Sequence, residues 1–427
     1  MHAAIIFFLL LVLMLAGMPI SISLGLTVLA FLFGFTQVPL ESVALKLFTG
    51  IEKFEIMAIP FFILAGNFLT HGGVARRMIN FATALVGHWH GGLGLGGVVA
   101  CALFAAVSVS SPATVVAIGS ILLPAMAKAG FPKRFGAGVI ATSGALGILI
   151  PPSIVMVMYA VATNTAVGAL FMAGVVPGLL LAMVLGGVTW WRARKNNYPR
   201  LPKATWGERW VAFRKSFWGL FLIVVVMGGI YSGIFTPTEA AAMSAVYAFI
   251  VAVFVYKDMG LKDVSRVLLS SANMSAMLLY IITNAALFSF IMTNENIPQA
   301  LADWMLGNGL GVITFLLAVN VILLLAGNFM EPSSIVLIFA PILFPVAIAL
   351  GIHPVHFGIL MVVNMEVGMC HPPVGLNLYV ASGITKMGIT ELTVAVWPWL
   401  LSMLGFLVVV TYWPDLSLWL PRTMGML

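Results

Sequence analysis

Four breaks in an otherwise apolar sequence hold most of the polar residues that could do chemistry. They are residues 108–112, 143–152, 327–333 and 364–373, and they are rich in serine, asparagine, glycine and proline. A helix that is interrupted leaves backbone carbonyl and N–H groups without partners inside the helix. Those carbonyls, together with serine and asparagine oxygens, are hard ligands of the kind that a small cation such as Na⁺ takes. The breaks therefore predict cation sites formed by neutral oxygens.

Two of the breaks lead directly into a helix, after Ser111-Pro112 and after Glu331-Pro332. A helix N-terminus presents free N–H groups and the positive end of the helix dipole, which favours a carboxylate. The same residues also suit an ordinary helix cap with proline at the first helical position. We favour binding of an anionic substrate because the breaks recur in register along the chain. The four breaks contain no arginine or lysine, so no two-pronged clamp for a carboxylate can be named.

Two acidic residues, Glu331 and Glu366, lie in the second pair of breaks. An unpaired charge inside a membrane protein is costly, so such a residue predicts a functional role. The first pair of breaks has Ser110 and Ala145 at the corresponding positions. Three interpretations remain open: a more acidic cation site, a carboxyl group that exchanges a proton, or a carboxylate that caps a helix. Glu239 differs, since Thr236-Pro237-Thr238-Glu239 has the spacing of a capping box.

An enzyme is disfavoured because the sequence lacks a catalytic arrangement. His371 beside Pro372 is more often structural than catalytic, and an intramembrane enzyme would need it to converge with Glu331 and Glu366. No nucleophile pair accompanies these groups. A channel is disfavoured as well, because neither a charged ring nor a repeated filter is present.

The composition places the whole chain in a lipid bilayer. Of its 427 residues, 62% are hydrophobic and only 8% charged, against about 25% charged residues in a soluble domain. The net charge of +7 comes from basic residues between apolar runs, which indicates membrane topology rather than nucleic-acid binding. We expect an all-α integral membrane protein with about ten or eleven transmembrane helices.

Apolar patterning predicts plain helices, two broken helices at 135–165 and 356–385, and two hairpins at 96–128 and 311–350. Each hairpin is split in the middle, and each half looks too short to cross about 30 Å of hydrocarbon. Both are expected to be re-entrant, with tips that face protein or water. The plain helices are expected near residues 3–16, 19–35, 56–71, 171–191, 217–235, 238–256, 267–290 and 390–412.

Lysine and arginine residues fix the orientation. Segment 192–215 holds eight of them and only one acid, so it is expected to be a cytoplasmic loop. The first hairpin is also flanked by basic residues and should enter from the cytoplasm. No lysine or arginine occurs from 294 to 350, so the second hairpin should enter from the opposite side.

The chain repeats itself with a shift of 221 residues, which predicts two repeats at 1–213 and 214–427. Five crossings plus one hairpin per repeat would invert the second repeat, as the charges require. The short first helix is the weak point, because its fusion with 19–35 would move the N-terminus across the membrane. The matching residues are Pro124 and Pro345, Gly130 and Gly351, Gly147 and Gly368, Pro151 and Pro372, Pro152 and Pro373, and Pro177 and Pro398.

Three motifs together resemble the large membrane subunit of TRAP transporters over essentially the full length. They are Ser110-Ser111-Pro112-Ala113-Thr114, the run Leu146-Gly-Ile-Leu-Ile-Pro-Pro-Ser153, and Gly229-Ile-Tyr-Ser-Gly-Ile-Phe-Thr-Pro-Thr-Glu-Ala-Ala241. One departure concerns the first hairpin tip, which in the family commonly reads Ser-Gly-Ser-Ser. Here it reads Ser108-Val109-Ser110-Ser111.

The resemblance implies Na⁺-driven uptake of an organic acid, of the sialic acid or C4-dicarboxylate class, across the bacterial inner membrane. It also implies a periplasmic substrate-binding protein (P type), a small four-helix membrane subunit (Q type) and an elevator-type movement. Nucleic acid is not an expected partner. A carrier of the same fold that needs no binding protein remains the alternative.

Carried over by position, the resemblance implies one Na⁺ site in each repeat and a substrate site between them. The implied Na⁺ ligands are Ser108, Ser110, Ser111, Gly144, Gly147 and Pro151 in the first repeat and Gly327, Asn328, Met330, Gly368, Cys370 and Pro372 in the second. The implied substrate residues are Ser111, Thr114, Ser143, Pro152, Glu331, Ser333, Asn364 and Glu366.

Overall fold

All regular secondary structure in the described part of the chain is helical. The structure, a computed structural model, describes residues 2–36, 38–373 and 375–427. Within these residues, eight helices are long and apolar enough to cross a membrane, and six apolar helices are shorter. The molecule is therefore an all-α membrane protein, as the composition predicts.

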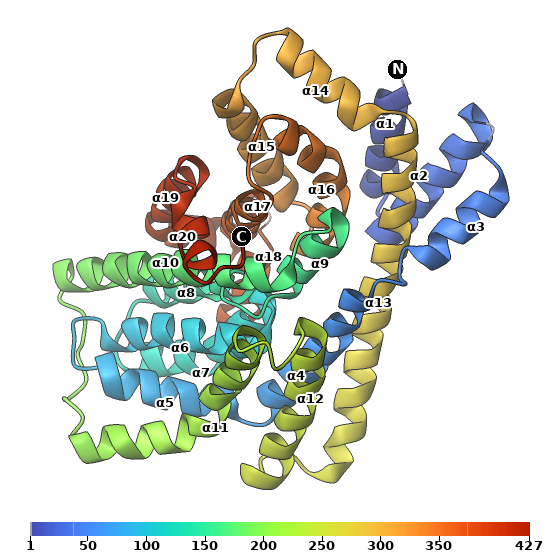
Figure 1. The fold of residues 1–427 in the computed structure, drawn as a ribbon. Helices are drawn as coiled ribbons and strands as arrows, with labels where there is room; N and C mark the ends of the chain where they lie inside the picture. The colour runs from blue at the N-terminus through green and yellow to red at the C-terminus, as the bar shows by residue number, and fades with distance from the viewer. Residues whose placement is uncertain (1, 37, 374) are drawn as a thin grey trace.

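The first repeat begins with two antiparallel helices and a short arm and ends with a long helix. Its hairpin and its broken helix lie in between, as Figure 1 shows in blue to green. The elements are α1 (His2–Leu15), α2 (Ile20–Phe35), α3 (Leu40–Thr49), η1 (Phe54–Met57), α4 (Ala58–His71), α5 (Val74–Val86), the hairpin α6 (Gly92–Ser108) and α7 (Ser111–Lys128), the broken helix α8 (Lys133–Ser143), η2 (Gly144–Ile148) and α9 (Ile154–Thr163), and α10 (Val167–Lys195).

The second repeat follows the same order and ends in one additional short helix. Its elements are α11 (Trp206–Tyr231), α12 (Pro237–Ile250), η3 (Val251–Val255), α13 (Leu261–Asn294), α14 (Ile297–Gly307), the hairpin α15 (Val312–Gly327) and α16 (Pro332–Ala349), the broken helix α17 (Pro354–Cys370) and α18 (Leu376–Thr385), α19 (Ile389–Tyr412) and α20 (Asp415–Thr423).

Helix bounds follow the 221-residue shift closely. Adding 221 to the bounds of α7, 111 and 128, gives 332 and 349, which are the bounds of α16. The turns after both hairpins are also alike, because Gly130 and Gly351 have positive φ values of 87° and 78°. One difference stands out: α3, η1 and α4 correspond to the single continuous helix α13.

The two repeats exchange packing partners at their centre. The second part of each broken helix packs on the hairpin of the other repeat, α9 on α16 and α18 on α7. The long helix α13 packs against α2, α3 and α4 of the first repeat and against α16 of the second; Figure 1 shows it in yellow along one flank. The hairpin tips are thus held by elements from both halves.

Several sequence expectations need correction. The basic segment 192–215 is a loop only over 196–205, because α10 continues to Lys195 and α11 begins at Trp206. A capping box of Thr205 and Glu208 starts α11 early. The predicted repeat boundary between residues 213 and 214 therefore falls inside α11. The second arms of both hairpins, α7 and α16, have 18 residues each and span about 27 Å, which is only slightly less than the thickness of the hydrocarbon core.

Helices α1 and α2 are separate, and a contact of His2 shows on which side of the membrane α1 begins. His2 Nδ1 lies 2.5 Å from Glu295 Oε2, and Glu295 follows the C-terminal end of α13. Three helices, α11, α12 and α13, separate Glu295 from the basic segment that precedes α11. His2 therefore lies on the membrane side opposite to that segment.

Candidate transport site

The tip of the first hairpin gathers side-chain and backbone oxygens. Ser108 Oγ lies 2.6 Å from Thr114 Oγ1 and 3.3 Å from the carbonyl oxygen of Ser110. Thr114 Oγ1 donates to the same Ser110 carbonyl at 2.9 Å. Three oxygens from one turn of chain therefore lie close together at the tip, as a hard cation requires.

The first broken helix closes on this tip through glycine. A Cβ atom on Gly147 would lie 2.8 Å from the Ser110 carbonyl oxygen and 2.9 Å from Ser111 Cα. On Gly144 it would lie 2.2 Å from a methyl group of Val115. The structure thus brings together the predicted residues of the first site, Ser108 to Ser111 with Gly144 and Gly147. Pro151 follows at the end of the break and forms a cis bond with Pro152.

Val109 has an unusual backbone conformation at the tip. Its φ is 51° and its ψ is 11°, the left-handed region that a β-branched residue rarely adopts. This is the position at which the related tip sequence carries glycine. Valine at this position therefore costs backbone free energy. The tip nevertheless keeps the left-handed conformation that glycine would adopt without that cost.

Val109→Gly is expected to raise the free energy of unfolding by about 1 kcal/mol, since glycine adopts this conformation without a Cβ clash. Thermal unfolding of the purified variant measures the effect. Val116→Gly is the matched control, because Val116 is exposed and helical in α7, the second arm of the same hairpin. Glycine at position 116 should lower the free energy of unfolding by about 1 kcal/mol. Equal destabilisation by both changes would contradict the assigned tip conformation.

A polar side chain that sequence reasoning missed, Asn377, joins the two repeats. Its Nδ2 donates to Ser111 Oγ at 2.8 Å and to the Ala141 carbonyl at 3.1 Å. Cys370 Sγ also donates to the Ala141 carbonyl, at 3.3 Å, so this side chain faces the first repeat. The predicted Cys370 thus offers only its backbone to the second site. Ser111 is part of a bridge between α7, α8 and α18.

The second hairpin tip also meets its broken helix through glycine. A Cβ atom on Gly327 would lie 2.9 Å from Gly368 Cα, and one on Gly368 would lie 3.0 Å from Gly327 Cα. Asn328 Oδ1 lies 3.2 Å from His371 Nδ1, so His371 connects the tip to the second broken helix. The structure therefore brings Gly327, Asn328 and Gly368 together. Pro372 follows and forms a cis bond with Pro373, and Met330 packs partly buried beside the tip.

The acidic residue of this tip, Glu331, is the N-cap residue of α16. It accepts a hydrogen bond from Ser334 Oγ at 3.3 Å, and Ser333 is buried in the first turn of the helix. Glu331 thus lies at a helix N-terminus, where the dipole favours a negative charge, but its side chain makes no capping hydrogen bond to the backbone of α16.

Three predicted substrate residues are fully buried and keep polar atoms without a partner. Ser143 Oγ, Asn364 Oδ1 and both carboxylate oxygens of Glu366 lack a hydrogen bond within the described residues. Asn364 is anchored only through Nδ2, which donates to Asn320 Oδ1 at 2.9 Å. Buried polar atoms are normally paired, so these atoms are candidates for binding an ion, a proton or a substrate group.

The side of α17 that carries Glu366 faces the first repeat. Glu366 and Cys370 are one helical turn apart on that side, and Cys370 contacts Ala141 near the end of α8. The described residues contain no cluster of three His, Cys, Asp or Glu side chains. Any cation at the breaks would therefore be held mainly by carbonyl and hydroxyl oxygens.

Inverted helical repeats, re-entrant hairpins and broken helices with facing tips define the class of secondary membrane transporters. Over residues 7–416 the chain matches the family model of the tripartite ATP-independent periplasmic transporter, DctM component. It belongs to that family.

The chain is similar to several curated relatives. It is 76% identical, over all of both chains, to the C4-dicarboxylate TRAP transporter large permease protein DctM of Rhodobacter capsulatus. Identity is 54% over 95% of both chains with the protein of that name from Pseudomonas aeruginosa. It is 37% over 96% of both chains with the sialic acid TRAP transporter large permease protein SiaM of Vibrio cholerae.

One solved structure supports the fold alone. The YdaH transporter of Alcanivorax borkumensis superposes with a TM-score of 0.63 at 17% identity, and the match covers 88% of each chain. The family and the fold establish a multi-pass membrane permease.

Proposed function

We propose that this chain is the large permease subunit of a Na⁺-coupled transporter that imports a C4-dicarboxylate. The observation that carries the substrate class is the full-length, 76% identity to a C4-dicarboxylate permease. The sialic acid relative is only 37% identical, so the choice falls on the dicarboxylate. The first hairpin tip fits this assignment, because it has no acidic residue and the N-terminus of the helix that follows Ser110 favours a carboxylate.

The proposed coupling uses the tip of each hairpin. One Na⁺ ion would bind the oxygens of Ser108, Ser110 and Thr114 beside Gly147, and a second the carbonyls around Gly327 and Gly368. Binding in both places would hold the tips against the broken helices and order the carboxylate site between them. Coupling then follows from the higher affinity of Na⁺ for the closed arrangement.

The proposed movement is that of an elevator. The hairpins and broken helices form one interlocked block, because α9 packs on α16 and α18 on α7. Helices α2, α3 and α4 each pack on α13, which lies beside this block. A block whose parts are tied together across the repeats can slide as a unit along such a support.

The proposed partners are a small four-helix membrane subunit and a periplasmic binding protein, in the bacterial inner membrane. Helix α11 offers an apolar lateral surface for the small subunit or for lipid, because only 22% of its apolar 18-residue stretch is buried. The basic segment before α11 would face the cytoplasm, so α9, α13 and α16 would present their ends at Thr163, Asn294 and Ala349 to the periplasm.

Uptake by proteoliposomes that contain both membrane subunits tests the substrate class. With the binding protein added outside, radiolabelled succinate should accumulate and sialic acid should not. Accumulation of sialic acid in preference to succinate would contradict the proposal. Succinate uptake by this chain alone, without its partners, would favour the alternative of a carrier that needs no binding protein.

A further inference from the structure

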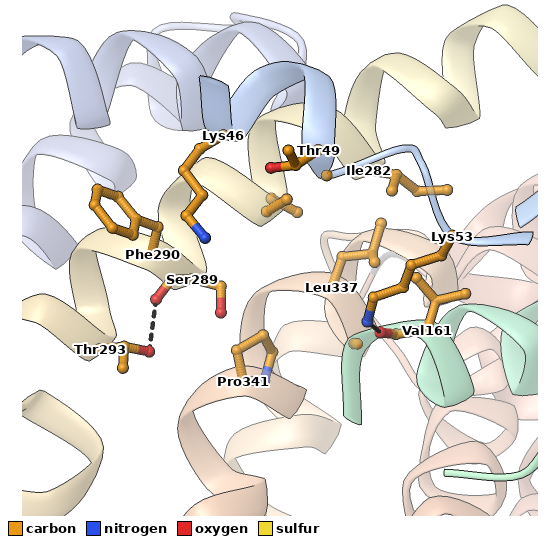
Figure 2. A pocket seen from close by; sticks show the side chains of 14 residues that line it. Lys46, Thr49, Lys53, Val161, Ile282, Ser289, Phe290, Thr293, Leu337 and Pro341 are labelled. Carbon is orange, nitrogen blue, oxygen red and sulfur yellow. Dashed lines mark hydrogen bonds between the residues drawn. The ribbon is translucent and has the colours of Figure 1, made fainter. Parts of the chain in front are cut away.

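A cavity of about 340 Å³ lies between the support helices and the block that holds the hairpins. This vestibule cavity is lined by α3 and α13 on one side and by α9 and α16 on the other, as Figure 2 shows. Its volume is within the range of small-molecule sites. Leu337 and Pro341, which line the cavity, lie about 9 Å and about 15 Å along α16 from Glu331 at the tip. The cavity is therefore separate from the hairpin tip.

Two ammonium groups supply all the formal charge of the lining. Lys46 and Lys53 both reach into the cavity in Figure 2, and the described residues place neither in an ion pair. Lys53 Nζ is held by the Val161 carbonyl at 2.5 Å and by Asn164 Oδ1 at 2.7 Å. Lys46 Nζ lies 5.3 Å from the centre of the Phe290 ring.

Hydroxyl groups complete the polar lining. Thr49, Ser289 and Thr293 contribute them from α3 and α13. Ammonium and hydroxyl donors without a carboxylate acceptor suit a small organic anion. The cavity is large enough for both ends of a dicarboxylate.

The inverted repeat shows that this charge is specific to one side. The positions that correspond to Lys46 and Lys53 in the second repeat are Val267 and Met274, and those that correspond to Ser289 and Thr293 are Phe68 and Gly72. Thr49 and Gly50 correspond to Ser270 and Ser271, so the equivalent region on the cytoplasmic side keeps hydroxyl groups but has neither of the two ammonium groups. An anion is favoured only on the side where α9 and α13 end, which the proposed orientation makes the periplasmic side.

We propose that the vestibule cavity is a receiving site that binds a C4-dicarboxylate through Lys46 and Lys53 before it reaches the hairpin tips. This inference rests on the proposed function. Lys53 is fixed by α9 and holds one carboxylate, and Lys46 on the arm helix α3 takes the other. The site raises the local concentration of the dianion beside the moving block.

Protection of an engineered thiol tests the site in the complete complex. Thr49→Cys places a thiol in the lining, while the native Cys101 and Cys370 are buried. In proteoliposomes, an impermeant maleimide labels only molecules whose cavity faces outward. Succinate should slow this labelling about tenfold and leave Leu45→Cys unaffected, because Leu45 is exposed on α3 outside the lining.

Lysine variants identify the groups that bind. In the Thr49→Cys background, Lys46→Gln should raise the succinate concentration for half-protection about tenfold, while Lys46→Arg should keep it near the original value. Lys262→Gln, which lies at the start of α13 and outside the lining, is the matched control. Equal protection in the Lys46→Gln variant and its parent would overturn the site.

The lipid composition of the vesicles separates a soluble dianion from a lipid phosphate. Protection by succinate should be the same in phosphatidylcholine with and without phosphatidylglycerol. Slow labelling that depends on phosphatidylglycerol and not on succinate would overturn the proposal in favour of a headgroup site. Succinate uptake without protection would overturn the receiving site alone, whereas protection without uptake would support the site and overturn the proposed function.

Discussion

Gly147→Ala is expected to reduce substrate uptake at least about 100-fold. The added methyl group would lie 2.8 Å from the Ser110 carbonyl oxygen and 2.9 Å from the Ser110 carbonyl carbon. These are backbone atoms, which cannot rotate away, so the tip must move off the broken helix. A displacement of about 1 Å in a constellation of binding groups costs about 100-fold in activity.

The helix α11 offers a matched control for this change. Gly228 is helical and a Cβ atom there would meet nothing within 4 Å, so Gly228→Ala should leave uptake unchanged and stabilise the helix by up to about 1 kcal/mol. Initial uptake rates, normalised to the amount of folded protein, measure both variants. Normal uptake by Gly147→Ala would show that tip closure on this glycine is not needed.

Glu366→Gln is expected to lower maximal uptake by about 10- to 100-fold, the usual effect of removing an ion-binding partner. Glu366 is fully buried and both of its oxygens lack a partner among the described residues. A charge in that position is costly unless a cation or a proton neutralises it. Glutamine has nearly the same shape but can neither carry the charge nor exchange the proton.

The kinetics of the Glu366→Gln variant distinguish the remaining interpretations. A higher Na⁺ concentration for half-maximal uptake would assign the carboxylate to a cation site, and a lost pH dependence would assign it to proton exchange. Glu41→Gln on the exposed side of α3 is the control and should behave as wild type. Uptake by Glu366→Gln that matches wild type in rate, Na⁺ dependence and pH dependence would exclude both interpretations.

Local sequence signals predicted the hairpins and the first broken helix well. The predicted break at 364–373 is wrong at its start, because α17 continues as a helix to Cys370. The proline and glycine breaks of the hairpins and broken helices interrupt runs of apolar residues, and each such pattern occurs a second time 221 residues later. The capping box at Thr236 is likewise confirmed, because Glu239 Oε2 accepts from the Thr236 N–H at 2.8 Å and Thr236 Oγ1 accepts from the Glu239 N–H at 3.3 Å. Such features depend on residues a few positions apart, which a sequence displays directly.

Contacts between distant residues could not be predicted in this way. Asn377 contacts Ser111, which is 266 positions away in the sequence. The corresponding residue of the first repeat is Met156, so the internal repeat did not indicate a polar role for this position. The arm α3 and the helices α5, α14 and α20 were missed because they have only 9 to 13 residues. All four also mix apolar with charged residues. The cavity at Lys46 and Lys53 exists only once α3 lies against α13.

Na⁺-driven accumulation tests the central proposal most directly. In sealed proteoliposomes with both membrane subunits, external binding protein and no membrane potential, an inward Na⁺ gradient should concentrate radiolabelled succinate above its external level. A Na⁺ ionophore should abolish this accumulation, and K⁺ should not replace Na⁺. Equal accumulation when K⁺ replaces Na⁺ on both sides would contradict Na⁺ coupling at the hairpin tips.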